Sequence, residues 1–188
     1  LAGALWAWPA IWLKITWNVD EIVTTLMLNY IAMLLTAYLV AFPFRAPSAI
    51  LAGTEAVASS ARLPRLVQGS VLNVGFLIAL ALVVLVYLLL FRTKLGYELR
   101  MVGLNRTFAS YAGMSVQRSA LMGMLISGAL AGVGGAAIIL GFFGRFITGF
   151  SAGYGWDGIV ICLLAKNNPV SVVPAAIFYA GLANGGLN

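Results

Sequence analysis

The sequence predicts an all-α membrane protein built as a polytopic bundle of transmembrane helices. Of its 188 residues, 62% are hydrophobic and 9% are charged, whereas a soluble domain is typically about 25% charged. A soluble chain of this size exposes too much surface to hide so many apolar side chains. The apolar residues also occur in runs about as long as a bilayer is thick, and a helix pairs the backbone polar groups of such a run internally.

Apolar runs divide residues 1–188 into six membrane segments of a single transmembrane domain. Tryptophans near the end of the first run are typical of a membrane–water interface. The fifth run is too short to cross a bilayer alone, and a short segment interrupted by glycine is typical of a broken membrane helix. The predicted segments cover approximately residues 1–13, 22–42, 70–91, 119–143, 154–166 and 170–187.

Polar residues connect the first three segments. Asp20 or Asn18 can cap the second segment, because both side chains accept hydrogen bonds from free backbone N–H groups. The loop at residues 43–69 is too polar to cross the membrane, and residues 54–61 are predicted to form a short surface helix. Asn29 lies at the middle depth of the second segment, where an unpaired amide is costly. It can either bond a neighbouring helix or line a polar pathway.

The main polar and basic interruption, residues 92–118, sets the predicted orientation. Cytoplasmic loops carry an excess of Lys and Arg, so this loop is assigned to the cytoplasmic side of a cell (inner) membrane that the chain crosses several times. Alternation of the segments then places on the inside Lys14, Arg92, Lys94, Arg100, Arg106, Arg118 and Lys166. It places outside Arg45, Arg62, Arg65 and Arg145. Because the basic residues lie in short loops, the net charge of +6 does not indicate nucleic-acid binding.

Helix start and stop signals within residues 92–118 predict two short helices. Residues 97–102 can form a helix closed by Gly103, and Asn105 is a good N-cap for a second helix over residues 106–112. Gly113 fits the position after that helix, where a left-handed backbone is common. The pair would form a rigid cytoplasmic knob joined at Gly103, and a protein partner is favoured over a loop lying on lipid headgroups. Its apolar side consists of Leu104, Phe108, Tyr111 and Ala112.

Small residues recur every four positions in the segment at 119–143. This spacing lets helix backbones approach closely in lipid, so the segment is predicted to be a packing axis of the bundle. One row contains Gly123, Ser127, Ala131 and Gly135, and a second row contains Gly128, Gly132 and Ala136.

Two glycine motifs that occur in enzymes are present without the context that they need. Residues 149–153 match G-x-S-x-G, but that motif needs a preceding strand and a histidine, and the chain contains no histidine. Residues 153–158 match G-x-G-x-x-G, but no βαβ unit surrounds them. The chain is therefore predicted to be no enzyme and to bind no metal or cofactor. If ATP and magnesium are used, a partner chain must bind them.

Asp157 is the acidic residue of the last third of the chain. A carboxylate beside an apolar helix is usually paired or functional. It can cap a helix that starts at Gly158, or it can face a pathway and accept hydrogen bonds from a polar solute. Tyr154 and Trp156 beside it can stack on a ring.

Several blocks of sequence resemble the permeases of ABC importers. Residues 96–105, GYELRMVGLN, are similar to the cytoplasmic loop of permeases that handle branched-chain amino acids, ribose and other simple sugars, and nucleosides. Residues 21–32, EIVTTLMLNYIA, are most similar to the nucleoside-type members. The likeness continues in the family's order at residues 111–113, 125–132, 153–159 and 167–169. The chain departs from the family at Arg106, where proline is common, and at Ser110, where arginine is frequent.

The resemblance implies a fold like that of vitamin B12-type importer permeases, of which this chain would lack helices at both ends. It implies a second identical or homologous permease, an ABC ATPase docked on residues 92–118, and an extracytoplasmic solute-binding protein or lipoprotein, all within membrane lipid. The expected function is ATP-driven import of a small polar solute, with a nucleoside or simple sugar favoured. An ion-coupled secondary transporter is the alternative, and it would use Asp157.

Two sets of site residues follow from this resemblance and from the patterns above. The ATPase is expected to act on Gly96, Glu98, Arg100, Gly103, Asn105, Tyr111 and Gly113. The translocation pathway is expected to be lined by Thr25, Asn29, Tyr154, Trp156 and Asp157.

Overall fold

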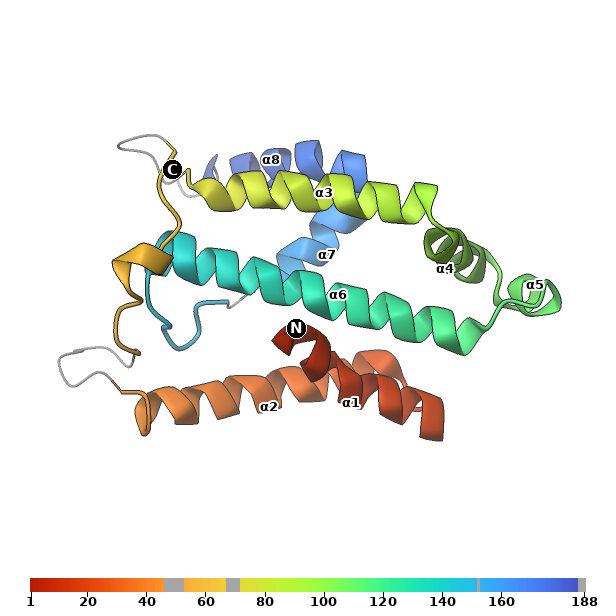
Figure 1. Cartoon of the computed structure of the whole chain (residues 1–188), viewed down its shortest axis with the longest axis horizontal. Helices are drawn as coiled ribbons and strands as arrows, with labels where there is room; N and C mark the ends of the chain where they lie inside the picture. Colours follow the sequence, from red (N-terminus) through yellow and green to blue (C-terminus); the bar gives the residue numbers. More distant parts are fainter. Residues whose placement is uncertain (46–52, 67–71, 152, 186–188) are drawn as a thin grey trace.

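Long helices lying side by side dominate the computed structural model, which describes residues 1–45, 53–66, 72–151 and 153–185. Figure 1 shows α6 in the middle of the molecule, with α1 and α2 on one side of it and α3 and α8 on the other. Three helical stretches are long and apolar enough to cross a membrane: α2 (Glu21–Ala41), α3 (Val74–Arg92), and α6 with its extension (Val116–Phe143). Two isolated β-bridges occur in the described part of the chain, and no strand is present there.

Helix α1 (Ala2–Trp17) continues past the predicted end of the first segment, so the polar turn before α2 is short. Asn18 ends α1 in a left-handed conformation. Asp20 caps α2, and its carboxylate accepts hydrogen bonds from the backbone N–H groups of Ile22 at 2.8 Å and Val23 at 3.4 Å. Of the two candidate caps, Asp20 therefore holds the position, because its side chain faces the free donors at the start of α2.

The described residues between α2 and α3 pack on the far end of α6 and are mostly not helical. The predicted helix over residues 54–61 is wrong apart from a single 3₁₀ turn, η1 (Ser59–Ala61). The backbone of Thr54 instead bonds Phe146 at 3.1 Å, and that of Val57 bonds Gly144 at 2.8 Å. The third segment was predicted to begin at residue 70, and residues 70 and 71 lie outside the described residues. Helix α3 begins after Asn73, whose side chain caps it.

Helix α6 (Val116–Ile138) begins three residues before the predicted segment, because the Ser115 hydroxyl accepts a hydrogen bond from the Arg118 backbone at 3.3 Å. Its far end is a π-helical turn, η2 (Ile139–Phe143), and Gly144 stops the helix with a φ of 63°. A left-handed residue at this position is a common helix stop, and glycine adopts it without a steric penalty.

The last two helices form a bent pair rather than two separate crossings. Helix α7 (Tyr154–Leu164) and helix α8 (Pro169–Gly185) meet at 119°, which is the geometry of a broken span or a re-entrant loop. Figure 1 shows α8 alongside α3 and α7 crossing behind α6. The prediction that Asp157 caps a helix starting at Gly158 is wrong, because α7 begins at Tyr154 and Asp157 lies in its first turn.

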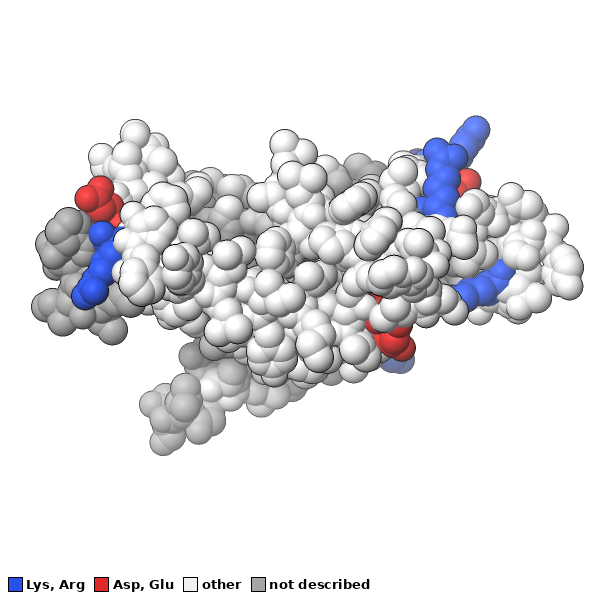
Figure 2. Space-filling model, turned by 90° about the horizontal axis from the view of Figure 1, so that it is seen from below, with Lys and Arg blue, Asp and Glu red and all other residues white. Residues whose placement is uncertain are grey.

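On the face shown in Figure 2, charged side chains gather towards the two ends of the molecule, and the band between them is uncharged. The long helices that cross this band are strongly apolar, and it is called the apolar band below. Few described side chains are fully buried, and most of those are small, such as Ala10, Ala109 and Ala165. Large apolar side chains on α2, α3 and α8 are exposed instead. This distribution suits a protein whose lateral surface faces lipid or further helices.

Candidate coupling and transport site

A tight elbow joins α3 to α4 (Lys94–Leu104) through one extended residue, Thr93. The Thr93 hydroxyl donates to the Leu89 carbonyl at 2.6 Å and accepts from the Gly96 backbone at 3.1 Å. Gly96 is buried against the last turn of α3, and a Cβ there would collide with the backbone of Leu89 and Leu90. Gly96 is therefore an element of the elbow, and its role is to let two helix backbones touch.

The two helices of the knob are joined at Asn105, not at Gly103. Helix α4 runs through Gly103 to Leu104, so the predicted glycine hinge is wrong. Gly103 keeps a helical backbone because nothing interrupts the hydrogen bonds of α4, whose last turn is closed by the Asn105 N–H bonding the Met101 carbonyl at 3.0 Å. Asn105 has an extended backbone, and this residue changes the direction of the chain.

The second helix of the knob, α5 (Arg106–Tyr111), is capped at both ends. The Asn105 side chain accepts a hydrogen bond from the Phe108 backbone at 3.0 Å, as an N-cap does. Gly113 has a φ of 77°, its N–H bonds Ser110, and the N–H of Met114 bonds Ala109, both at 3.0 Å. These two bonds make a Schellman motif, so the chain enters and leaves α5 in defined directions.

Replacing Asn105 with alanine is expected to loosen α5 by about 1 kcal/mol, because the first turn loses its side-chain acceptor. Limited proteolysis near Arg106 measures this, since trypsin cuts faster where the helix opens more often. Asn105→Ser retains a capping oxygen and should digest at close to the original rate. Equal rates for the alanine and serine variants would show that the cap does not hold α5.

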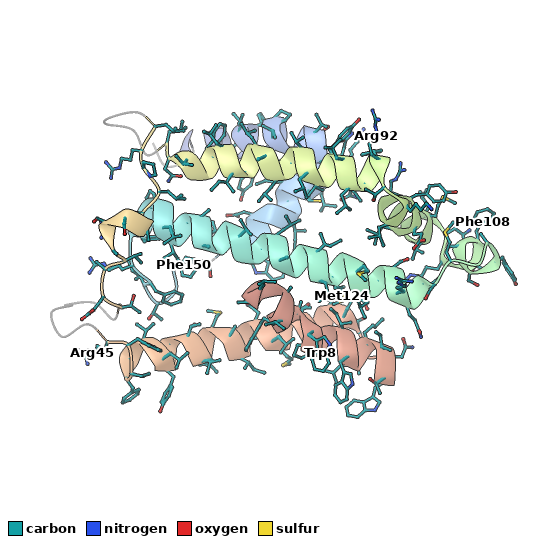
Figure 3. The ribbon with its side chains drawn as sticks, viewed as in Figure 1. Trp8, Arg45, Arg92, Phe108, Met124 and Phe150 are labelled. Atoms are coloured by element: carbon teal, nitrogen blue, oxygen red, sulfur yellow. The ribbon has the colours of Figure 1, made fainter. Side chains whose placement is uncertain are left out.

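The knob presents an exposed apolar surface at the tip of the polar end. The side chains of Leu104, Phe108 and Tyr111 are 81%, 56% and 86% exposed, respectively, which is unusual for residues outside the apolar band. Figure 3 shows Phe108 at the far end of the molecule from Arg45. Ala109 anchors the opposite side of α5 and is fully buried. The surface formed by Leu104, Phe108 and Tyr111 is called the knob surface below.

Glu98 and Arg100 lie on α4 rather than on the knob surface. The Arg100 guanidinium lies over the Phe91 ring, 4.6 Å from its centroid, so this side chain is directed back towards α3. Glu98 lines the same hollow at the elbow. Two of the seven residues on which the ATPase is expected to act, Glu98 and Arg100, thus lie nearer the end of the apolar band than the tip of the knob.

A cavity of about 470 Å³ lies behind the knob, between α1, α4 and α6. An ion pair between Lys14 and Glu21 closes one side, with 2.6 Å between Nζ and Oε2. Ser119 lines the cavity and is almost fully buried, and its hydroxyl has no hydrogen-bond partner among the described residues. Movement of α4 against α1 would change the volume of this cavity, so the knob has room to shift relative to the long helices.

Close packing of α1 on α6 holds the long helices beside the knob. A Cβ on Gly128 would lie 2.7 Å from the Gly3 carbonyl oxygen and 2.9 Å from the Ala7 Cβ. Gly132 also lies against Gly3. Of the other small residues, Gly123 faces Leu99 of α4, Ser127 and Ala131 are exposed, and a Cβ on Gly135 would meet nothing within 4 Å.

The five predicted pathway residues fall into two groups that the described fold does not bring together. Thr25 and Asn29 lie exposed on α2, which packs on α1. Within the described part of the chain, the hydrogen bond of the Asn29 amide goes to the Met33 sulfur of its own helix, at 3.9 Å. Tyr154, Trp156 and Asp157 lie on α7, and Figure 1 shows α6 between α2 and α7.

Asp157 has a partner that sequence reasoning missed. The Tyr179 hydroxyl of α8 donates a hydrogen bond of 2.6 Å to the Asp157 carboxylate, and this bond ties the two arms of the bent pair together. Nothing in the spacing indicates that contact, because it depends on the bend near residue 166. The contact of Gly3 in α1 with α6 did have a signal in the sequence, because Gly3 and Ala7 repeat the four-residue spacing of small residues.

Comparison with known proteins identifies the family. The model of the family described as branched-chain amino acid transport system / permease component matches residues 1–188. A glucose ABC transporter permease protein of Haloferax volcanii is 38% identical, over 99% of this chain and 52% of its own length. A guanosine ABC transporter permease protein of Bacillus subtilis is 37% identical, over 100% of this chain and 55% of its own length. No solved structure matches the chain.

These matches agree with the helical architecture described above. A nucleoside ABC transporter permease protein of Lactococcus lactis is 30% identical, over 88% of this chain and 48% of its own length. The chain spans about half the length of these curated relatives. Because the family model covers every residue and the described helices are apolar over bilayer length, the chain belongs to the branched-chain amino acid transport system permease family and is a multi-pass membrane protein.

Proposed function

We propose that this chain is part of the permease subunit of an ATP-driven importer in the cytoplasmic membrane. The observation that carries the proposal is the knob: a doubly capped helix on an elbow, with an exposed apolar surface at the polar end of a membrane protein. The family supports it, since the relatives are named as ABC transporter permeases. ATP and magnesium would be bound by a separate ATPase subunit that docks on the knob surface.

The arrangement of the elbow explains how a docked ATPase would act on the membrane helices. The knob continues α3 through the Thr93 elbow and reaches α6 through the Gly113 turn. Because both connections are short and hydrogen-bonded, a displacement of α5 would be transmitted to the ends of α3 and α6 rather than absorbed by a flexible loop. The cavity behind α4 leaves space for that displacement.

We further propose that the solute is small and polar, with a nucleoside or simple sugar favoured. The names of the relatives specify glucose, guanosine and nucleosides for those proteins. Thr25 and Asn29 offer hydrogen-bonding groups, while Tyr154 and Trp156 offer aromatic faces that stack on rings. The proposal includes a second permease, identical or homologous, and an extracytoplasmic solute-binding protein or lipoprotein that would deliver the solute.

Replacement of Phe108 and Tyr111 by aspartate is expected to abolish ATPase docking. Two exposed aromatic side chains on one surface are typical anchors of an interface, and a charge at each anchor should weaken association by at least tenfold. Copurification of the ATPase with the permease measures docking, and ATP-dependent uptake of radiolabelled guanosine or glucose into vesicles measures the consequence.

Phe44→Asp is the matched control, because Phe44 is 61% exposed but lies at the opposite end of the molecule. It should retain the ATPase. Retention of the ATPase by the Phe108→Asp, Tyr111→Asp variant would refute docking on the knob surface. Uptake that requires no ATPase but collapses when a proton uncoupler is added would identify an ion-coupled transporter instead.

A further inference from the structure

We propose that the elbow between α3 and α4 binds the headgroup of an anionic phospholipid. The hollow at this elbow has a volume of about 480 Å³ and is called the headgroup site. Its lining includes Phe91, Arg92, Lys94, Glu98 and Arg100. The proposal rests on the multi-pass membrane location of the chain and is independent of the identity of the solute or the energy source.

The charge of the headgroup site selects an anion. Arg92, Lys94 and Arg100 line it together with one carboxylate, Glu98, so three positive charges and one negative charge leave a net charge of +2. Among the described residues, none of these three cations forms an ion pair; the single salt bridge there joins Lys14 to Glu21. Figure 2 shows Lys and Arg side chains clustered at this end of the molecule. Uncompensated cations that face one hollow attract a phosphate group.

The depth of the headgroup site favours a lipid over a soluble anion. Helix α3 is apolar along its whole length, and its first basic residue is Arg92 at the end, so the cations begin where the hydrocarbon ends. Figure 3 shows Arg92 at the end of α3. Tyr87 and Phe91 lie one helix turn apart, with ring centroids 4.9 Å apart. Tyrosine is enriched at membrane–water interfaces.

An apolar wall continues from the headgroup site into the bilayer region. Tyr87, Leu88 and Phe91 are exposed on the last turns of α3 and offer a surface for acyl chains. The Arg100 guanidinium, held over the Phe91 ring, joins this wall to the cationic hollow. A molecule with a phosphate at one end and hydrocarbon at the other matches both surfaces, whereas a soluble anion uses only the first.

A protein partner is less suited to the headgroup site than to the knob. The knob surface is apolar and lies at the tip, where a soluble ATPase subunit can reach it. The headgroup site lies at the base of α4, and its Arg100 is directed towards α3 rather than towards the tip. The two surfaces therefore suit two different ligands, a protein at the tip and a lipid at the base.

The test uses the purified permease in detergent and dioctanoyl phosphatidylglycerol below its micelle concentration, with dioctanoyl phosphatidylcholine as the neutral comparison. Dissociation constants are measured by thermophoresis at low and high salt. We expect at least tenfold tighter binding of phosphatidylglycerol, decreasing with salt because the attraction is screened. Each neutralised cation should weaken phosphatidylglycerol binding by about fivefold.

Three variants make the test specific. Arg92→Gln, Lys94→Gln, Arg100→Gln combined should remove the preference for phosphatidylglycerol. The matched control, Arg45→Gln, Arg65→Gln, Arg145→Gln combined, removes the same charge elsewhere and should keep it. Glu98→Gln removes the carboxylate of the headgroup site and should tighten phosphatidylglycerol binding by about fivefold, a gain that misfolding cannot produce.

The proposal is overturned if the triple variant at the elbow keeps the lipid preference, if its control loses it equally, or if Glu98→Gln weakens binding. Displacement of the lipid by inorganic phosphate at equal concentration would show a site for free anions instead. Loss of ATPase copurification in the elbow variant, with the lipid preference intact, would show that the cluster contacts protein rather than lipid. Because lipid binding is measured without ATP or solute, failure here is distinguishable from failure of the proposed import function.

Discussion

Replacement of Gly96 by alanine is expected to destabilise the protein by about 3 kcal/mol or more and to abolish the proposed ATP-dependent uptake. The α3–α4 elbow is closed by backbone packed on backbone, and the added Cβ would collide with the Leu89 carbonyl oxygen. A flexible side chain can rotate away from such a contact, but helix backbone cannot. The elbow must therefore open, which would displace α5 and uncouple the proposed ATPase docking surface from α3.

The apparent melting temperature in detergent checks this expectation, with uptake as the second readout. Gly103→Ala is the matched control for stability, because it lies in the same helix and a Cβ there would meet nothing within 4 Å. Alanine is the better helix former by about 1 kcal/mol, so the same chemical change should stabilise α4 at Gly103. If Gly96→Ala melts within about 2 °C of the original protein, the elbow is not closed by this glycine.

Replacement of Gly128 by valine is expected to separate α1 from α6 and to cost about 2–3 kcal/mol. The first added carbon would lie 2.7 Å from the Gly3 carbonyl oxygen, and the branched methyl groups add further bulk. Membrane helices associate mainly through close van der Waals packing, so a gap between them is not compensated by the hydrophobic effect. Loss of this contact should lower the melting temperature and the yield of folded protein.

Gly134→Val in the same helix is the control, because a Cβ at Gly134 would meet nothing within 4 Å. Both variants introduce the same change in helix propensity, so the difference between them isolates the contact with α1. Ala7→Gly in the Gly128→Val background should recover part of the lost stability, since the Ala7 methyl is the other close neighbour. Equal melting temperatures for Gly128→Val and Gly134→Val would contradict close packing at this crossing.

The helix caps and helix stops were predictable from the sequence, because each depends on groups only a few residues apart. The Asp20 cap, the Asn105 cap and the left-handed Gly113 each satisfy backbone groups within three or four positions. No tertiary contact is needed to choose them. The Gly103 hinge was wrong for a related reason: glycine permits a helix stop, but α4 has no cause to stop before Asn105.

Contacts between distant segments were not predictable, because they depend on where the chain bends. Tyr179 meets Asp157 only because α7 and α8 meet at 119°. Arg100 reaches Phe91 only because the Thr93 elbow folds α4 against α3. The two rows of small residues on α6 indicated close helix packing, but they did not indicate which row faces α1. In the structure Gly128 contacts α1, whereas Gly135 of the other row does not.

The amino-acid sequence by itself determined the membrane class, the approximate long helices and the capped helix at the tip of the knob, because hydrophobic run length and capping chemistry are local properties. Only the tertiary structure decided where the knob turns, which glycines face another helix, and that Arg92, Lys94 and Arg100 share one hollow. The physical reason is that a single elbow sets the direction of every residue after it. Its geometry depends on backbone contacts between α3 and α4 that no local pattern specifies.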